Sequence, residues 1–196
     1  ASHYFPNDEK IKSLKMRYSP NPNTSYYQSA QVLFNSKKYK EAITLYKASE
    51  SVYNELGGFD NNPNFLNFWG RSHLELNEIN EAKELFNRVL KEDLKNFYAH
   101  MNLGNIAFHK EKNYKVAEYH FSNCINSKKP DLFLTYKNLG TVYLVQQKND
   151  EAISSYENAL KHGLGKDIIG NLYLLWKSKG NESKMAYYKA ELDKLK

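Results

Sequence analysis

Small, hydrophobic and aromatic residues recur along this chain at a period of about 35 residues. The most regular marks are five alanines separated by 40, 35, 35 and 34 residues: Ala42, Ala82, Ala117, Ala152 and Ala186. Twelve or thirteen residues before them stand Ala30, Gly70, Gly104, Gly140 and Leu174. Four residues after the first four alanines stand Tyr46, Phe86, Phe121 and Tyr156. Self-similarity at this period predicts supersecondary units that stack on their neighbours.

Within each copy, apolar residues are spaced three or four apart, as on one face of an α-helix. The spacing predicts five antiparallel helix pairs, at about residues 23–56, 63–96, 97–131, 133–166 and 167–196. Residues 57–62, which begin with two glycines, interrupt the pattern and explain the first interval of 40 residues. Residues 1–22 stand apart, with three prolines and mixed charges. A short helix, a cap on the first pair and partial disorder all remain open for them.

The spacing also predicts how each pair packs. The small residue on the first helix is expected to let the second helix approach closely and to meet the recurring alanine. The aromatic residue four positions later lies one turn along the same face, where we expect it to fill the groove between this pair and the next. Cys124 occupies a slot that other copies fill with small side chains, which predicts a buried structural role. The last pair departs from the pattern at Leu174 and Ala190, as expected of a terminal unit whose outer face meets water.

The repeated pattern resembles the tetratricopeptide repeat. The fourth copy carries it most fully, with Tyr136, Leu139, Gly140, Tyr143, Glu151, Ala152, Ile153, Tyr156, Ala159 and Leu160. The third copy has one extra residue, which we expect in its internal turn. The resemblance covers residues 23–196 and implies an all-α fold. It predicts a right-handed α-solenoid of four repeat-like units, followed by a degenerate fifth pair as a C-terminal cap.

In that family the first helices line a concave groove that takes peptides or partner segments. Carried onto this chain, the groove positions are Tyr27, Gln31, Phe34, Asn67, Arg71, Leu74, Met101, Asn105, Phe108, Lys137, Thr141 and Leu144. A mixture of aromatic, amide and cationic groups suits an extended or helical peptide. For Phe34 and Phe108 the alternative is that the rings cap the hydrophobic core or hold the N-terminal segment.

One specific function of the family can be tested on the sequence. Chaperone adaptors with this repeat clamp a terminal carboxylate with Lys, Asn, Asn, Lys and Arg from three successive units. Starting from the third unit, the corresponding residues are Met101, Asn105, Asn138, Ile168 and Leu172. Starting from the second unit, they are Asn67, Arg71, Asn102, Leu134 and Asn138. The first set lacks all three cations and the second is no better, so a receptor for chaperone tails is disfavoured.

Composition changes this picture little. The net charge is +6 and the pI is about 9.1, which raises the alternative of a Lys-rich binder of nucleic acid or another anionic surface. Only three of the 28 basic residues are Arg, the residue that planar phosphate and base recognition favours. Together with 23 Asn and 16 Tyr, this indicates a compositional bias rather than a binding surface. Direct binding of nucleic acid is therefore unlikely.

Catalytic and metal-binding patterns are weak. The six histidines form neither a metalloprotease pair nor a cluster with zinc spacing, although His109 and His120 flank a turn and could approach each other. Residues 163–166 resemble a fragment of a phosphate-binding loop but lack its full frame, and we interpret them as a turn in which Gly163 ends a helix. A single cysteine excludes an intramolecular disulfide. We therefore predict no catalytic residue, metal or cofactor.

These observations favour a non-enzymatic interaction module or scaffold that binds a peptide or partner segment in a concave groove. Self-association is a further alternative, with the groove occupied by residues 1–22 of a neighbouring copy. The sequence contains no run of about 18 apolar residues, so no membrane span is expected. The compartment stays open: cytoplasmic, or exported if a leader was removed before Ala1.

Overall fold

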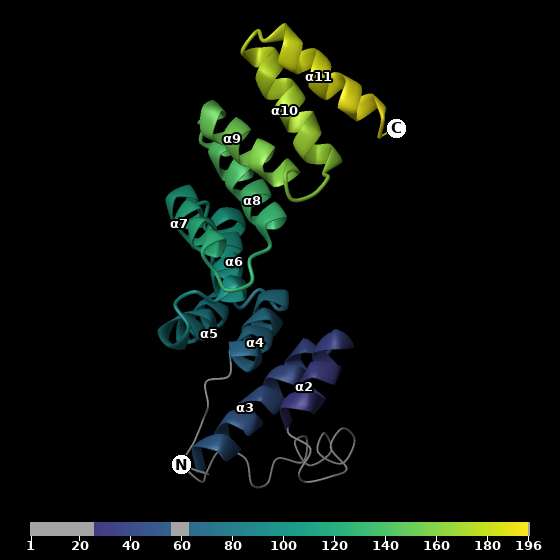
Figure 1. Ribbon diagram of the computed structural model, residues 1–196. Coiled ribbons are helices and arrows are strands. Elements are labelled where there is room, and N and C mark those ends of the chain that lie inside the picture. Colours follow the sequence, from purple (N-terminus) through teal and green to yellow (C-terminus); the bar gives the residue numbers. More distant parts are fainter. Residues whose placement is uncertain (1–25, 56–62, 196) are drawn as a thin grey trace. The chain divides into compact units, whose positions relative to one another are not determined.

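The computed structural model describes residues 26–55 and 63–195, which form α-helices joined by short turns, without strands in these ranges (Figure 1). The expected N-terminal segment, residues 1–22, and the interruption at residues 57–62 lie outside the described residues. The helices divide into two compact bodies, one ending at Ala99 and the other beginning at His100. Below, these are the N-terminal body and the C-terminal body.

The N-terminal body contains two helix pairs and the start of a third. Helix α2 (Tyr26–Asn35) packs against α3 (Tyr39–Glu55), and α4 (Pro63–Glu75) packs against α5 (Ile79–Glu92). Helix α6 (Phe97–Asn105) begins in this body. Turns of three residues within each pair force the two helices to run antiparallel.

The C-terminal body contains the remaining pairs. Helix α6 continues into a π-helical turn, η1 (Ile106–Lys110), which packs against α7 (Tyr114–Ile125). The next pairs are α8 (Leu132–Val145) with α9 (Asn149–Leu160), and α10 (Lys166–Ser178) with α11 (Glu182–Asp193). Asp131 begins α8 by accepting a hydrogen bond from the Leu134 amide, as an N-cap side chain does.

The turn inside each of the first four pairs is the same. It contains one left-handed residue five positions before the recurring alanine: Lys37, Asn77, Lys112 and Gln147, with φ between 54° and 60°. In the first pair the Lys38 amide donates to the Leu33 carbonyl, a bond that closes the end of a helix in a Schellman motif. Glu78 and Lys148 make the equivalent bond in the second and fourth pairs.

The extra residue of the third copy lies in a different place from the one predicted. The sequence led us to expect it in the turn, but the first helix absorbs it as η1, and the left-handed turn at Lys112 is unchanged. The closing bond accordingly spans one residue more, from the Asn113 amide to the Ala107 carbonyl. Insertion of one residue into an α-helix is the usual origin of a π turn.

In the second, third and fourth pairs, the aromatic residue of the second helix lies closest to the glycine of the first. A β-carbon at Gly70, Gly104 or Gly140 would lie 2.7, 2.6 or 2.5 Å from a ring carbon of the aromatic residue in the same pair. The recurring alanines of the first four copies are fully buried, as expected. The ring of the second helix therefore lies directly over the glycine of the first.

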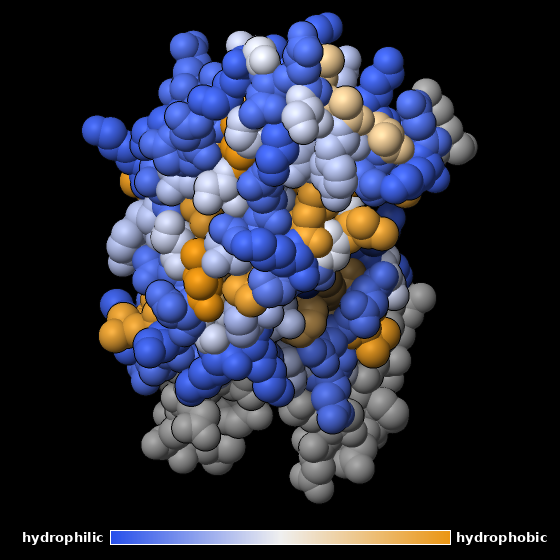
Figure 2. Space-filling view, turned by 45° about the horizontal axis from the view of Figure 1, so that its top comes forward, coloured by the Kyte–Doolittle hydropathy of each residue, from blue (hydrophilic) through white to orange (hydrophobic). Residues whose placement is uncertain are grey.

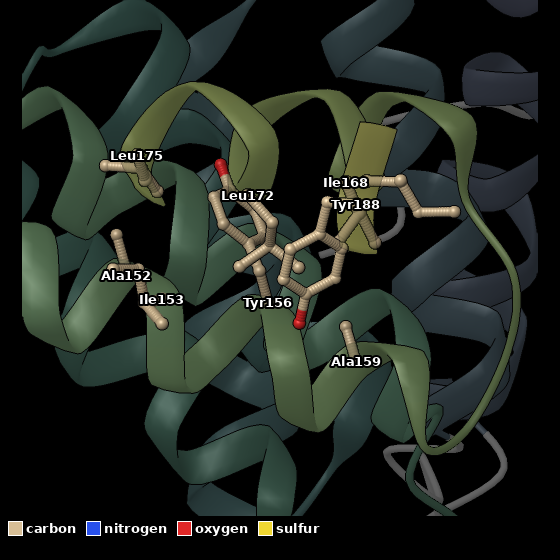
Figure 3. Packing of buried hydrophobic residues seen from close by; sticks show 9 residues of the cluster. Ala152, Ile153, Tyr156, Ala159, Ile168, Leu172, Leu175 and Tyr188 are labelled. Atoms are coloured by element: carbon tan, nitrogen blue, oxygen red, sulfur yellow. The ribbon is translucent and has the colours of Figure 1, made fainter. Parts of the chain in front are cut away.

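The fifth pair packs with a shifted register. Ala186, the expected fifth mark, is exposed, and Leu174 is 60% exposed, whereas Tyr188 is only 5% exposed. The left-handed residue of this turn, Gly180, stands six rather than five positions before Ala186, so α11 begins one residue earlier relative to the repeat pattern. Figure 3 shows the result, with Tyr188 of α11 meeting side chains of α9 and α10 that include Tyr156.

Two smaller predictions concern single residues. Cys124 is fully buried, and burial raises the pKa of its thiol to about 12, in agreement with a structural role. Gly163 lies in the turn after α9, but it does not have the left-handed conformation of a helix-ending glycine. Instead a β-carbon there would lie 2.9 Å from the ring of Phe133, so the glycine allows that ring to approach the backbone.

Candidate partner-binding site

The N-terminal body contains a hollow of about 340 Å³ on its first helices, which we call the Arg71 hollow. Its lining comes from α2, α4 and the start of α6: Tyr27, Gln31, Asn64, Asn67, Phe68, Arg71 and Tyr98. Amide and aromatic side chains dominate this lining, and Arg71 is its only charged member. The hollow is therefore positively charged, polar and bordered by rings.

Arg71 stacks on two aromatic rings. Its guanidinium carbon lies 4.9 Å from the centroid of Phe34 and 5.7 Å from that of Phe68, within the range of cation–π contacts. Arg71 is exposed, and no carboxylate among the described residues pairs with it. The guanidinium is therefore held in position by contact with aromatic rings and not by an opposite charge.

Tyr27 and Gln31 form one wall of the hollow. The Gln31 amide nitrogen donates to the Tyr27 hydroxyl oxygen at 2.8 Å, one helical turn apart. Burial raises the pKa of Tyr27, so the hydroxyl stays protonated at neutral pH. Because its oxygen accepts from Gln31, its hydrogen remains available, and no described residue accepts it.

Asn67 is fixed by a chain of hydrogen bonds. Asn96 accepts the Ala99 amide at 3.1 Å with its side-chain oxygen, which therefore acts as an N-cap for α6. The same oxygen accepts from Asn67 Nδ2 at 3.2 Å, so the amide nitrogen of Asn67 must face Asn96. Asn67 is 5% exposed, and its Oδ1 is buried without a hydrogen-bond partner. The hydroxyl of Tyr46 is likewise buried without a partner.

The C-terminal body contains a second hollow, of about 250 Å³, which we call the Lys137 hollow. Its lining comes from α6, η1, α7 and α8: Asn105, Phe108, His109, Phe121, Lys137, Asn138 and Thr141. Lys137 Nζ lies 2.6 Å from Asp167 Oδ2, and its hydrogen bond holds the pKa of Asp167 below the usual value. The cation of this hollow is therefore paired within the protein.

The hydroxyl of Tyr156, a buried residue of α9 in the same body, also has hydrogen-bond partners. Tyr156 shares a hydrogen bond with Thr141 at 3.2 Å and accepts one from Asn171 Nδ2, also at 3.2 Å. Burial raises the pKa of Tyr156, which keeps this hydroxyl protonated.

The structure gathers most of the sequence-predicted groove residues at the two hollows. Those lining a hollow are Tyr27, Gln31, Asn67, Arg71, Asn105, Phe108, Lys137 and Thr141. Phe34 is 9% exposed and packs edge-on against Tyr39 and Phe68, so the alternative of a core ring holds for it.

Three further predicted residues lie outside the two linings. Met101 is 6% exposed, and its sulfur accepts a hydrogen bond from Asn138. Leu74 is half-buried on α4, and Leu144 packs against the core cluster of the last pairs.

Several lining residues were missed by the sequence interpretation. Asn64 and Tyr98 stand six positions before the pattern residues Gly70 and Gly104, and Phe68 and Asn138 stand two positions before Gly70 and Gly140. Because each of these two offsets from the glycine occurs in two copies, the sequence spacing could have identified these four residues as lining positions. His109 reaches the Lys137 hollow from the π turn, which the sequence pattern does not announce.

The histidines pair differently from the expectation. His100 and His120 bring their Nδ1 atoms to 3.0 Å, whereas His109 is exposed and does not meet His120. Among the described residues no group of three metal-ligating side chains comes together. No helix in the described ranges is both long and apolar enough to cross a membrane.

Figure 2 shows one face of the molecule as a mainly hydrophilic surface. On this face, hydrophobic residues form small separate groups and not a continuous patch. A partner that meets this face therefore contacts mostly polar and charged side chains.

Comparison with known proteins agrees with this architecture. Two family models, both described as tetratricopeptide repeat, match residues 24–55 and 69–122. A solved structure titled MamA 41-end from Desulfovibrio magneticus RS-1 is 18% identical, with a TM-score of 0.71 and coverage of 96% of each chain. Another, titled crystal structure of MamA protein, is 20% identical, with a TM-score of 0.71 and coverage of 85% of this chain and 87% of that one. No curated protein sequence matches significantly. The predicted all-α repeat fold is confirmed.

Proposed function

Because the chain carries tetratricopeptide repeats, we propose that it is a non-enzymatic interaction module that binds an extended segment of a partner protein on its first helices. Arrays of this kind present surfaces to partners rather than catalytic pockets. The repeats themselves support the general role of a protein-interaction scaffold. The segment, its conformation and the residues that contact it are the finer part of the proposal.

The observation that supports the finer part is the composition of the two hollows. Each is lined mainly from consecutive first helices by amides, rings and one cation, and the Lys137 hollow also includes Phe121 of α7. Amide side chains can pair with main-chain groups of a bound segment, and rings provide apolar contact, which together suit peptide recognition.

A comparative pull-down tests the proposal. The full chain is immobilised, exposed to a lysate of its source cells, and the retained proteins are quantified by mass spectrometry. Arg71→Ala and Asn105→Ala are expected to reduce retention of the same partner, while circular dichroism shows unchanged helicity. The matched control is Asn87→Ala, which truncates an exposed amide on α5 away from both hollows and should retain the partner. If both hollow variants bind like the wild type, the assignment of the site is wrong.

A further inference from the structure

We propose that the Arg71 hollow recognises the side-chain carboxylate of an Asp or Glu located within the bound segment of the partner. This inference rests on the proposed peptide-binding function and specifies the chemistry that one hollow selects. It concerns an internal acidic side chain and not a chain terminus.

The first argument is the state of Arg71. Phe34 and Phe68 contact the guanidinium from one side, since their own ring centroids lie only 5.4 Å apart, and the rings do not replace a hydrogen-bond acceptor for its planar fork of N–H groups. No described carboxylate pairs with those groups, and none lines the hollow. A planar fork of donors fixed in this way matches the two oxygens of a carboxylate.

The second argument is the supply of another donor beside Arg71. The Tyr27 hydroxyl lines the same hollow, and because it accepts from Gln31 its hydrogen is free to donate to an acceptor in the hollow. A carboxylate can accept from several donors at once, since each oxygen has two lone pairs. A neutral amide or hydroxyl on the partner would leave more of these donors unused.

The third argument separates a peptide from a simple anion. Asn67 lines the hollow, and its buried Oδ1 lacks a donor. A phosphate or a carboxylate offers oxygen acceptors but no N–H to this atom. A peptide segment supplies both groups, a side-chain carboxylate for Arg71 and main-chain N–H groups as donors. A buried acceptor without a donor is unfavourable, so an occupant that supplies one is preferred.

The Lys137 hollow is not expected to share this preference. Its cation is already paired with Asp167 at 2.6 Å, and its neighbouring tyrosine is hydrogen-bonded to Thr141 and Asn171. An acidic side chain placed there would compete with a carboxylate of the protein itself. The selection for acid is therefore a property of the N-terminal body.

A random peptide library displayed on phage tests the proposal. The peptides are fused to the coat protein through their C-termini, so that terminal carboxylates cannot contribute. The library is selected in parallel on the full chain, on Arg71→Gln and on Asn87→Ala. Peptides selected by the wild type and by Asn87→Ala are expected to share one position enriched in Asp or Glu. That enrichment is expected to be absent from peptides selected by Arg71→Gln.

A synthetic peptide from the wild-type selection, with an amidated C-terminus, then gives the affinities. Replacing its acidic residue by the matching amide should weaken binding roughly ten- to a hundredfold, the range for hydrogen bonds to charged groups. Arg71→Gln should bind the original peptide equally weakly, and the two changes together should weaken binding little further. Arg71→Lys keeps the charge without the planar fork and should lie between. Circular dichroism verifies the helicity of each variant.

The outcomes distinguish this inference from the function on which it rests. Wild-type peptides without a shared acidic position, or an acidic preference that persists in Arg71→Gln, would overturn the inference. If such peptides nevertheless lose binding in Asn105→Ala, the peptide-binding function stands and only the acidic preference is wrong. If no selection enriches peptides above those retained by bare resin, both proposals are overturned.

Discussion

Tyr46 and Tyr156 occupy the same position of the repeat in the two bodies, but only the hydroxyl of Tyr156 is hydrogen-bonded. Both rings are fully buried. The hydroxyl of Tyr156 bonds to Thr141 and to Asn171, whereas that of Tyr46 has no partner. The difference does not come from the tyrosine. It comes from what its polar neighbours do.

The neighbours of Tyr46 are engaged elsewhere. Gln31 and Asn67 stand at the repeat positions of Thr141 and Asn171. Gln31 donates to Tyr27, and Asn67 donates to Asn96, so neither satisfies Tyr46. The polar groups around Tyr156 in the C-terminal body are thus hydrogen-bonded to one another, whereas Tyr46 and Asn67 Oδ1 in the N-terminal body are buried without partners. This contrast is the reason that we place the proposed acid-selective site in the N-terminal body.

The largest expected effect is on the packing beneath the satisfied tyrosine. In Gly140→Leu the new side chain must displace the Tyr156 ring, whose carbon would lie 2.5 Å from the β-carbon. Overpacking of this kind costs about 1–3 kcal/mol or more. The free energy of unfolding, measured with urea, should fall accordingly. The control is Gly170→Leu on α10, where a β-carbon has no neighbour within 4 Å, and an equal loss there would exclude overpacking as the cause.

Thiol labelling of Cys124 measures how Gly140→Leu affects the C-terminal body alone, because Cys124 is the single cysteine and lies in that body. Its thiol is fully buried, and burial raises its pKa to about 12, so a thiol reagent at pH 8 should not label the native protein. Gly140→Leu should be labelled at a lower urea concentration than the wild type. Labelling of the wild type without urea at the rate of the unfolded chain would contradict the buried environment of the thiol.

Deleting each hydroxyl tests the comparison directly. Tyr156→Phe removes hydrogen bonds to Thr141 and Asn171 and should cost about 0.5–1.5 kcal/mol per bond at most. Tyr46→Phe removes a buried hydroxyl without a partner and should be neutral or stabilising. Urea unfolding of the two variants gives both values. Equal destabilisation would mean that Tyr46 has a partner in solution, which would weaken the distinction between the bodies.

The smallest effect concerns the ion pair of the Lys137 hollow. Asp167→Asn removes the partner of Lys137, but both side chains are partly exposed, so the change in stability should stay below about 1 kcal/mol. The pKa of Asp167 is lowered in the folded state, mainly by the hydrogen bond from Lys137. Its contribution is therefore present above the unfolded pKa and is lost as the pH falls through the folded one. The variant should lose less stability than the wild type on acidification below about pH 4.

The same variant also sharpens the proposal for the binding site. With Lys137 unpaired, peptides selected on Asp167→Asn should gain a second acidic position. If that position does not appear, pairing with Asp167 is not what separates the two hollows.

The sequence predicted the repeats, because glycines, alanines and rings at a fixed period leave few ways to pack a helix pair. It also predicted most hollow-lining residues, since positions on one helix face follow from their distance to Gly70, Gly104 and Gly140. It did not predict the hydrogen-bond partner of a side chain that lies near several donors or acceptors. Asn67 donates to Asn96, whose side-chain oxygen also caps α6, and it does not bond to Tyr46. The spacing of residues along the sequence does not show that Asn96 lies beside Asn67.

The same limit explains the error in the last pair. Ala186 matches the period, but the turn at Gly180 and the start of α11 come one residue earlier relative to it than in the other copies, and Ala186 is exposed. Tyr188 supplies the buried ring instead. The period locates the helix along the chain, but it does not determine which face of the last helix is buried.

The π turn η1 shows how this chain tolerates a change of length. The additional residue is accommodated upstream of Lys112, and the connection to α7 keeps the backbone geometry of the other copies. The helix therefore accommodates the extra residue within a single π turn, and the rest of the helix pair is unchanged. The displaced turn carries Phe108 and His109 into the lining of the Lys137 hollow. A one-residue insertion thus changes which side chains line this hollow while the helix pairs downstream keep their phase.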